Sequence, residues 1–238
     1  MKFGNKSLQA EESQIEEWVS LSDLMTSLMM LFLLVAVAYM VKVEADSTKI
    51  KKIAVLYDQL RIELYKDLDA EFSPDLARWG AELDKDSTIR FKEPEVLFAT
   101  GKDELKPKFK AILNDFFPRY LRILTSDKYK NSIQEVRIEG HTSSIWNSNS
   151  SEADAYFLNM NLSQNRTMST LRYVTQLPNA TEEIRWLRKY LTANGLSSSK
   201  LAFNNDGSEN MERSQRVEFR IRTDAESRIA TIIELAQQ

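Results

Sequence analysis

The chain has 238 residues but no cysteine and only one histidine. Without cysteine it forms no disulfides, so its folded part must be held by an apolar core even in an oxidising compartment. His141 has no cysteine, metal-binding cluster or serine triad around it, so we predict a structural role for it and no enzymatic activity. Barrel-forming strands are also missing, which argues against an outer-membrane porin. The net charge of −3 is unremarkable, and we expect no direct contact with nucleic acid.

One apolar stretch decides the class of the protein. The residues from Leu24 to Val41 carry no charge, and a run of about 18 such residues has the length that crosses the hydrocarbon core of a membrane. Trp18 and Tyr39 lie 21 positions apart, or about 32 Å along a helix, so their rings match the two headgroup levels. We therefore predict a polar tail over residues 1–17 and a transmembrane helix over residues 18–43.

A cleavable signal peptide is the competing interpretation, because Val43–Ala45 resembles a small-residue cleavage site after an apolar core. The leader before the core is long and carries four glutamates against two lysines, and the core exceeds the usual length of a signal peptide. Retention of the helix as a membrane anchor is therefore favoured.

Positive charges leave the orientation of this helix open. More lysines follow the apolar run than precede it, which weakly places the C-terminal side in the cytoplasm. Long domains cross the membrane largely regardless of charge, however, and about 190 residues follow the helix.

Beyond the membrane segment we predict a helical linker and then a folded domain. Over residues 44–75, apolar side chains recur at steps of three and four, which indicates an amphipathic helix able to pack on its own copy in a dimer. These side chains are Ile53, Leu56, Leu60, Leu64 and Leu68.

Residues 76–238 alternate between strand and helix patterns and predict an α+β sandwich with one core. Pro107 is expected in the first turn of a helix, and Val217, Phe219 and Ile221 are expected on one face of a strand. The expected strands are 87–91, 134–139, 200–203 and 216–222, the expected helices are 106–124, 163–175, 181–192 and 225–236, and 143–157 is expected to be an enlarged loop.

Short motifs in this domain resemble the OmpA-like peptidoglycan-binding family. Phe98–Gly101 is similar to the family's opening Phe-x-x-Gly, and Glu139–Thr142 to the end of its second strand. The segment 159–166, with Asn159, Leu162, Ser163 and Arg166, is similar to its signature helix start, and Arg216–Phe219 to its last strand. The resemblance implies a peptidoglycan-binding site that includes Asn159, Leu162, Arg166, Thr142 and Ser143.

Arg166 carries the chemistry of this implied site. Its planar guanidinium suits the carboxylate of a peptidoglycan stem peptide, and Asn159 can add hydrogen bonds. The residues alone favour a simpler interpretation, in which Ser163 caps the helix and Arg166 faces solvent, and the resemblance reverses this preference.

One position departs from the family pattern. The family usually has an aspartate directly after the Gly-x-Thr turn, where it pairs with the ligand's ammonium, whereas this chain has Ser143. Either wall binding is weaker, or Glu152 or Asp154 from the enlarged loop supplies the acid.

The membrane segment resembles a more particular family. Trp18–Phe32 is similar to the Trp-x-x-x-x-Asp-Leu/Phe-x-Thr-x-Met-Met segment of MotB-type stator subunits, with one extra residue before the Met pair. Phe3–Asn5 and the Asp-Leu-Met-Thr run of Asp23–Thr26 are more similar still to the ZorB family of the Zorya anti-phage defence system. The pairing of such a helix with an OmpA-like domain is stronger evidence than either half alone.

Asp23 is the candidate ion-carrying residue. It lies five residues beyond Trp18, or about 7.5 Å along the helix, so it is expected inside the membrane near its edge. A buried carboxylate there costs about 2.5 to 3.5 kcal/mol, so an intramembrane acid is a functional candidate. Ser20, Thr26 and Ser27 share its helical stripe, which would face a partner subunit. The alternative is an acid at the membrane edge that reaches water or caps the helix.

Together the two resemblances imply the homodimeric, peptidoglycan-anchored B subunit of an ion-driven rotary motor. Its other partner would be a ring of polytopic MotA-like A subunits, with no bound cofactor and a proton, or else sodium, as the coupling ion. The family places such a chain in the bacterial inner membrane with the N-terminus in the cytoplasm and the folded domain in the periplasm. Anti-phage defence is the preferred role. A flagellar stator subunit is the alternative within this class, and a passive tether between membrane and wall is the alternative from another class.

Overall fold

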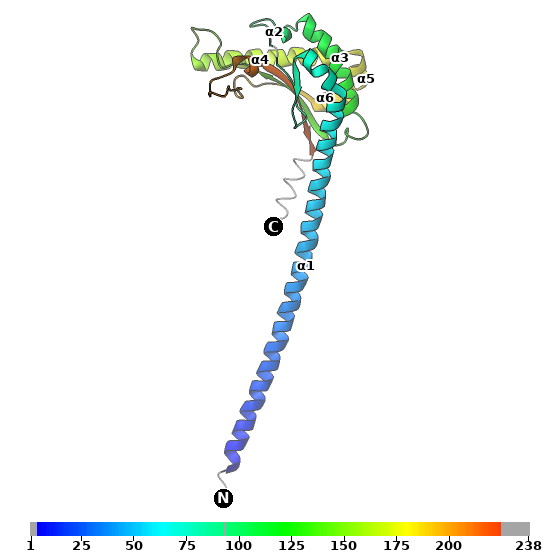
Figure 1. Ribbon diagram of the computed structural model, residues 1–238. Coiled ribbons are helices and arrows are strands. Elements are labelled where there is room, and N and C mark those ends of the chain that lie inside the picture. The colour runs from blue at the N-terminus through cyan, green and yellow to red at the C-terminus, as the bar shows by residue number, and fades with distance from the viewer. Residues whose placement is uncertain (1–3, 93, 225–238) are drawn as a thin grey trace. The chain divides into compact units, whose positions relative to one another are not determined.

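The structure is a computed structural model that describes residues 4–92 and 94–224, with backbone only for residues 4–17, 19–20, 49–58, 94–95 and 179. The chain forms two units, one up to Ile53 and one that begins at Ala54. Helix α1 (Gly4–Trp79) contributes to both, so the units are described separately (Figure 1).

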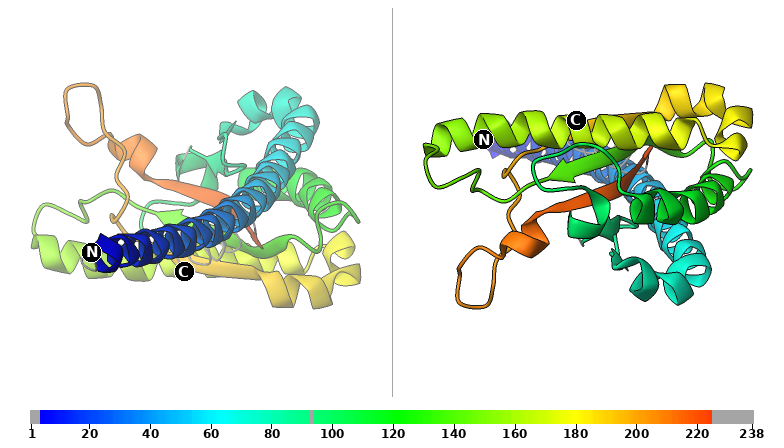
Figure 2. Two further views of the ribbon diagram at one scale, coloured as in Figure 1. Left: turned by 90° about the horizontal axis from the view of Figure 1, so that it is seen from below. Right: turned by 90° about the horizontal axis from the view of Figure 1, so that it is seen from above.

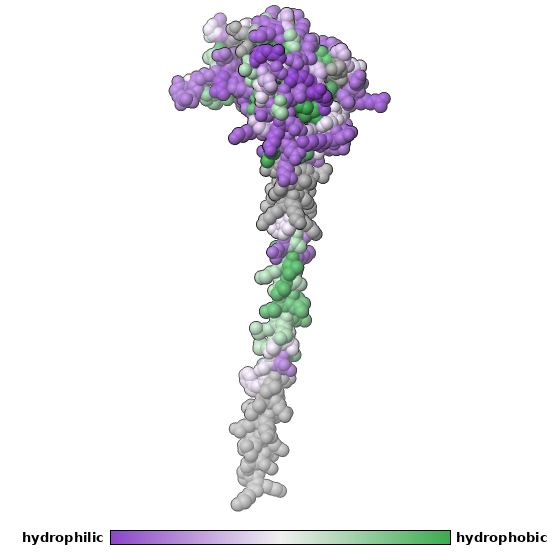
Figure 3. Space-filling view, turned by 45° about the vertical axis from the view of Figure 1, so that its right-hand side comes forward, coloured by the Kyte–Doolittle hydropathy of each residue, from purple (hydrophilic) through white to green (hydrophobic). Residues whose placement is uncertain are grey.

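The first unit contains the part of α1 that is apolar enough to cross a membrane. This span runs from Leu21 to Thr48 with a mean hydropathy of 2.4, and no side chain of its most apolar window is buried within the chain. Figure 3 shows apolar side chains exposed along this part of the helix. A core helix of a soluble protein would be covered, so this segment needs lipid or other subunits around it. The tail over residues 1–17 is helical from Gly4 onwards.

The second unit begins with the remaining turns of α1, which enter its core. Leu64, Leu68 and Phe72 are each at most 1% exposed. The ring of Phe72 lies 5.2 Å from that of Phe116, measured between centroids. The apolar stripe predicted as a linker is thus, from Leu64 onwards, buried by its own domain, and the expected boundary at residue 75 falls inside the helix.

The core is completed by a five-stranded sheet in the order β1-β2-β5-β3-β4. The parallel pair is β3 with β4, and the other neighbouring strands are antiparallel. The strands are β1 (Ala81–Leu83), β2 (Ile89–Phe91), β3 (Ile133–His141), β4 (Leu191–Gly195) and β5 (Arg216–Thr223). The helices after α1 are α2 (Pro94–Leu97), α3 (Pro107–Leu124), α4 (Glu152–Thr175), α5 (Pro178–Glu182), α6 (Ile184–Tyr190) and α7 (Met211–Ser214).

The two faces of the sheet differ in chemistry. Val217, Phe219 and Ile221 are buried on one face, as predicted. The ring of Phe219 lies 5.1 Å from that of Phe116 on α3, and α4 packs against β3 and β4 (Figure 2). The opposite face carries charged side chains, namely Arg90, Arg137, Glu139, Arg216, Glu218, Arg220 and Arg222. The predicted α+β class with an N-terminal apolar helix is confirmed.

Several predicted boundaries were wrong. Helix α4 begins at Glu152, because the Ser151 hydroxyl caps it by accepting a hydrogen bond from the Asp154 amide at 3.1 Å, so the enlarged loop ends there. The predicted helix 181–192 is divided into α5 and α6, and the strand β4 follows directly. Residues 200–203 form no strand beyond an isolated bridge at Phe203. The predicted helix 225–236 lies outside the described residues.

Candidate functional site

A cleft of about 690 Å³ lies beside α4, where the loops after β2 and β3 meet the segment before β5. It belongs entirely to the second unit. The cleft brings together all five residues predicted to bind peptidoglycan. It is lined by Val96, Phe98, Thr100, Gly101, Thr142, Ser143, Ile145, Trp146, Asn159, Leu162, Arg166, Glu212 and Gln215.

Arg166 of α4 reaches one wall of the cleft and is only 7% exposed. Its Nε donates to the Lys102 carbonyl at 2.8 Å and its Nη2 to the Ala99 carbonyl at 3.3 Å. The guanidinium carbon lies 4.9 Å from the centroid of the Phe98 ring. Among the described residues none accepts a hydrogen bond from Nη1. The side chain is therefore held in place by the segment from Phe98 to Lys102, while one donor group is left for a ligand.

The charge of Arg166 is poorly compensated. Burial lowers its pKa to about 10, although the charge of Asp103 acts in the opposite direction. Arg166 is thus a protonated, desolvated cation at neutral pH, and no carboxylate of the described residues lies within ion-pair distance of it. A buried cation of this kind favours an anionic ligand.

The turn after β3 forms the next wall. Asn159 is 3% exposed, and its Nδ2 donates to the Ser143 carbonyl at 3.1 Å, so this hydrogen bond connects the turn to α4. The Ser143 hydroxyl donates to the Ile145 carbonyl at 3.4 Å. The Thr142 hydroxyl is buried, and no described residue is its hydrogen-bond partner. The missing aspartate is thus replaced by a hydroxyl that bonds within its own turn.

Two glycines allow α4 to lie close enough to the sheet to form this wall. A methyl group at Gly195 would come within 2.3 Å of the Gln164 backbone nitrogen, and one at Gly140 within 2.7 Å of Thr167 Cγ2. Ser163 lies inside α4 with no exposure, and its hydroxyl accepts from the Ser197 amide at 3.1 Å. Neither a Ser163 cap nor a solvent-facing Arg166 fits this arrangement.

Sequence reasoning missed the part of the cleft that comes from distant segments. Ile145 and Trp146, from the β3–α4 loop, and Glu212 and Gln215, from the segment before β5, also line it. An apolar pair in a polar loop was a usable signal for the first two. Nothing local distinguishes Glu212 from other surface acids. Glu152 and Asp154, proposed as replacement acids, do not line the cleft.

The second predicted site lies in the first unit. Asp23, Thr26 and Ser27 are exposed on α1, and the Thr26 hydroxyl donates to the Ser22 carbonyl at 2.7 Å. The side chain of Ser20 lies outside the described residues. The hydroxyl of Thr26 is therefore satisfied within the helix, whereas the Asp23 carboxylate is available to water or to another subunit.

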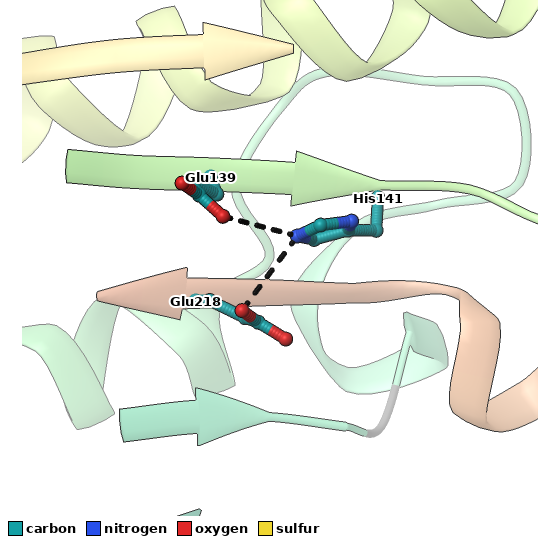
Figure 4. A group of neighbouring side chains, drawn as sticks. All are labelled: Glu139, His141 and Glu218. Carbon is teal, nitrogen blue, oxygen red and sulfur yellow. Dashed lines mark ion pairs between the residues drawn. The ribbon is translucent and has the colours of Figure 1, made fainter. Parts of the chain in front are cut away.

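A third cluster lies on the charged face of the sheet (Figure 4). Glu139 and Glu218 are directly opposite each other in the register of β3 and β5. His141 Nε2 lies 3.7 Å from one carboxylate oxygen of each, and the donor atoms lie within 4.8 Å of one another. That spacing could hold a metal ion, because the oxygens that face His141 are Oε2 of Glu139 and Oε2 of Glu218. The hydrogen bonds from Arg90 at 2.8 Å and Arg216 at 2.7 Å go to the other oxygen, Glu218 Oε1, and these arginines compensate the charge of Glu218.

Protonation in this cluster follows its surroundings. Burial lowers the pKa of His141, with help from the charge of Arg216 and against the two glutamates. Burial alone would raise the pKa of Glu218, but hydrogen bonds from Arg216 and Arg90 lower it to about 2. His141 is thus buried and favoured in its neutral form between two ionised acids.

Comparisons with known proteins agree with this architecture. No protein-family profile matches the chain. The Zorya protein ZorB of Escherichia coli strain Crooks is 46% identical over 234 residues, which cover 98% of this chain and 99% of that protein. The chain belongs to the ZorB family. The Zorya protein ZorB of Escherichia coli O139:H28 is 28% identical over 92% of this chain and 85% of that protein.

A solved structure extends the family's resemblance to MotB. A Desulfovibrio vulgaris protein described as MotB-like is 28% identical, with a TM-score of 0.50 over 70% of this chain and 94% of that one. The 46% identity to ZorB of strain Crooks confirms the ZorB family resemblance predicted from the motifs. The apolar helix and the MotB-like domain together fit a single-pass protein of the inner membrane.

Proposed function

We propose that this protein is the peptidoglycan-anchored B subunit of a proton-driven rotary motor in the inner membrane, acting in anti-phage defence. Two copies would stand within a ring of MotA-like A subunits, with the N-terminus in the cytoplasm and the folded domain in the periplasm. The anti-phage role rests on membership of the ZorB family of Zorya proteins. We expect no enzymatic activity and no bound cofactor.

The wall end of the proposal is supported by the cleft. Arg166 presents a buried cation with a free donor group, and Thr142, Ser143, Asn159 and Leu162 surround it. A peptide carboxylate would compensate that charge and accept from Nη1. Peptidoglycan stem peptides carry such carboxylates on a rigid, immobile polymer, which would hold the domain in place.

The acid in the apolar part of α1 is the main support for the proposal, because it distinguishes a motor from a passive tether. Asp23 is the one acid in the apolar span between Leu21 and Val43 and is exposed on the helix. A carboxylate sealed against a partner favours its neutral form, and one that meets a water path favours its ionised form. One elementary charge that moves through 100 mV releases about 2.3 kcal/mol, which is enough to bias successive steps of a surrounding ring. Ser20, Thr26 and Ser27 would face that ring.

A passive tether needs both ends of the protein but not the titratable proton of Asp23. Asp23→Asn keeps the size of the side chain and its hydrogen-bonding capacity, so membrane insertion and wall binding should survive. An amide cannot alternate between protonated and ionised forms, so we expect phage protection to fall to the level of a gene deletion. Plating efficiency of phage on cells with the intact operon, together with the amount of protein in membranes, measures this.

Two controls define the outcome. Glu44→Gln removes an acid from the far side of the apolar run and should protect like the wild type, and Asp23→Glu should retain part of the activity. If Asp23→Asn cells are fully protected, the motor proposal is wrong and the protein is a passive tether.

A further inference from the structure

Glu139, His141 and Glu218 bring three ligand atoms together at the centre of the sheet. Glu139 and His141 lie two positions apart on β3 and so share one face of the strand, and Glu218 of β5 lies directly opposite Glu139. The three residues are at most 3% exposed, and the His141 ring lies between the two carboxylates (Figure 4). Its Nε2 is 3.7 Å from Oε2 of each glutamate, which is too long for a hydrogen bond.

The atoms that face one another in this cluster lack other partners. Among the described residues, none is a hydrogen-bond partner of Glu139 Oε2 or of either ring nitrogen of His141. A buried polar atom without a partner costs free energy, and like charges directly opposite each other on neighbouring strands add to this cost. A neutral imidazole keeps a lone pair on one ring nitrogen. One cation among the three atoms would therefore satisfy the lone pair and both carboxylate oxygens at once.

The distances suit a metal ion. Zinc binds imidazole nitrogen and carboxylate oxygen at about 2.0 to 2.2 Å, so two ligand atoms of a tetrahedral site lie about 3.4 Å apart. The three ligand atoms here lie within 4.8 Å of one another, and the two distances from Nε2 are both 3.7 Å. Small side-chain rotations are thus sufficient to bring the three atoms to coordination distance of one ion.

The arginines around the cluster leave its inner oxygens available. Those that bond Glu218 use its other oxygen, Oε1, and the two arginines nearest Glu139 stay 3.9 Å from its carboxylate. Three of these arginines are also bonded to a second acid, namely Arg90 to Asp84 at 2.7 Å, Arg137 to Glu135 at 2.8 Å and Arg220 to Asp86 at 3.1 Å. Because the outer acids compensate these arginines, both inner carboxylate oxygens can bind a cation.

We propose that Glu139, His141 and Glu218 bind one divalent transition-metal ion, and that Zn²⁺ is the ion that suits them best. An imidazole ligand favours zinc and the neighbouring transition metals over Mg²⁺ and Ca²⁺, which prefer oxygen ligands. Three protein ligands leave the fourth position of a tetrahedral site to water. The side chains of Arg137 and Arg220, beside Glu139, are each 33% exposed, so solvent reaches to within one side-chain layer of the ligands.

The ion would connect two neighbouring strands in the interior of the sheet. Strands β3 and β5 are adjacent in the sheet order, and Thr142 and Ser143 of the cleft follow His141 directly. A metal bound to His141 would therefore fix the start of the turn that lines the cleft. It is a structural ion that takes part in no reaction, and it depends neither on the motor nor on wall binding. The sequence did not indicate this site, because Glu218 is distant from His141 along the chain.

Zinc titration of the full chain in mild detergent tests the site. The protein is purified with a tag that contains no histidine, so that His141 is the only imidazole, and a chelator then removes bound metal. We expect the dialysed protein to take up about one Zn²⁺ per chain and no Mg²⁺, as measured by elemental mass spectrometry. Zinc at about 100 times its Kd should raise the midpoint of thermal unfolding by about 5 to 10 °C.

Substitutions then locate the ion. Glu139→Gln and His141→Gln should each bind zinc at least about tenfold more weakly than the wild type, because each removes one ligand. Glu82→Gln is the matched control, since Glu82 lies on β1 of the same sheet and outside the cluster, and it should bind zinc like the wild type. The unfolding midpoints of the metal-free variants show whether a loss of binding reflects a loss of folding.

A measurement on the wild type decides the matter even if a variant does not fold. One equivalent of Zn²⁺ should shift the ring-nitrogen NMR signals of the single histidine, whereas Mg²⁺ should leave them unchanged. The assignment is wrong if the wild type binds no zinc or if zinc leaves these signals unchanged. It is also wrong if Glu139→Gln and His141→Gln bind zinc as tightly as the wild type, since the ion then lies elsewhere.

Discussion

The two halves of helix α1 have the same backbone conformation but opposite relations to the rest of the protein. Between Leu21 and Thr48, the side chains of the most apolar window remain uncovered by the chain. Between Leu60 and Trp79, apolar side chains occupy one stripe, and Leu64, Leu68 and Phe72 are buried in the core of the second unit. The first half exposes its apolar side chains and needs a lipid or subunit environment, whereas the apolar side chains of the second half are covered by its own domain.

This difference teaches that an uninterrupted helix is not one structural unit. Substitutions in its second half act on the core of the second unit, because Leu64, Leu68 and Phe72 are buried there. In the second unit the helix ends among the rings of Phe72, Trp79 and Phe116.

The sharpest test of the comparison is a pair of identical substitutions in the same helix. Phe72 is fully buried and Phe32 is 63% exposed. Phe72→Ala removes ring contacts from a packed core and should lower the free energy of unfolding by about 3 to 5 kcal/mol. Phe32→Ala should change it by less than about 0.5 kcal/mol. Denaturant unfolding of the full chain in detergent, followed by near-ultraviolet circular dichroism, measures both. Equal effects would mean that the second half of α1 is only a linker.

A second test separates wall binding from both halves of the helix. Arg166→Ala removes charged hydrogen bonds worth about 1.5 to 3 kcal/mol, so sedimentation with peptidoglycan should weaken at least about tenfold. The protein should still fractionate with membranes, because α1 is unchanged. Arg172→Ala is the matched control, since Arg172 is exposed on the same helix and does not line the cleft. If Arg166→Ala sediments with peptidoglycan as well as the wild type does, Arg166 does not bind the wall.

The smallest expected effect concerns pH and is confined to the domain. The pKa of His141 in the folded state lies below the ordinary value of 6.5, chiefly because of burial. The unfolded chain therefore binds a proton more readily than the folded chain, and stability falls as the pH drops through 6.5 towards the folded-state pKa. Glu218 contributes stability that is lost only below its ordinary pKa of 4.5, since its folded-state pKa is about 2.

Thermal unfolding of the full chain between pH 7.5 and pH 5 isolates the histidine. The wild type should lose stability over this range, and His141→Gln should lose less of it. If the variant keeps the wild-type slope, another group is responsible. Helix content in the membrane segment should not change over this range in either protein.

Local patterns predicted much of the fold correctly. The helix with Pro107 in its first turn and the strand with Val217, Phe219 and Ile221 on one face are both present. Failures occurred where packing overrides local preference. The segment 191–195 was predicted to end a helix, but it forms strand β4 and pairs with β3 in parallel. That pairing depends on residues more than fifty positions away in the sequence. The prediction placed the start of helix α4 at residue 163 instead of Glu152, because its cap, Ser151, lies in a polar segment that is typical of a loop.

By itself the sequence determined that the chain has an apolar helix long enough to cross a membrane, with an acid near its start, because length, hydropathy and one charge are local properties. It also determined the motif from Asn159 to Arg166, whose residues are close along the chain. Only the tertiary structure decided that the end of α1 is part of the core and that Glu212 shares a cleft with Arg166. Both depend on contacts between segments distant in sequence, which form because burial of apolar surface selects one packing of the whole domain.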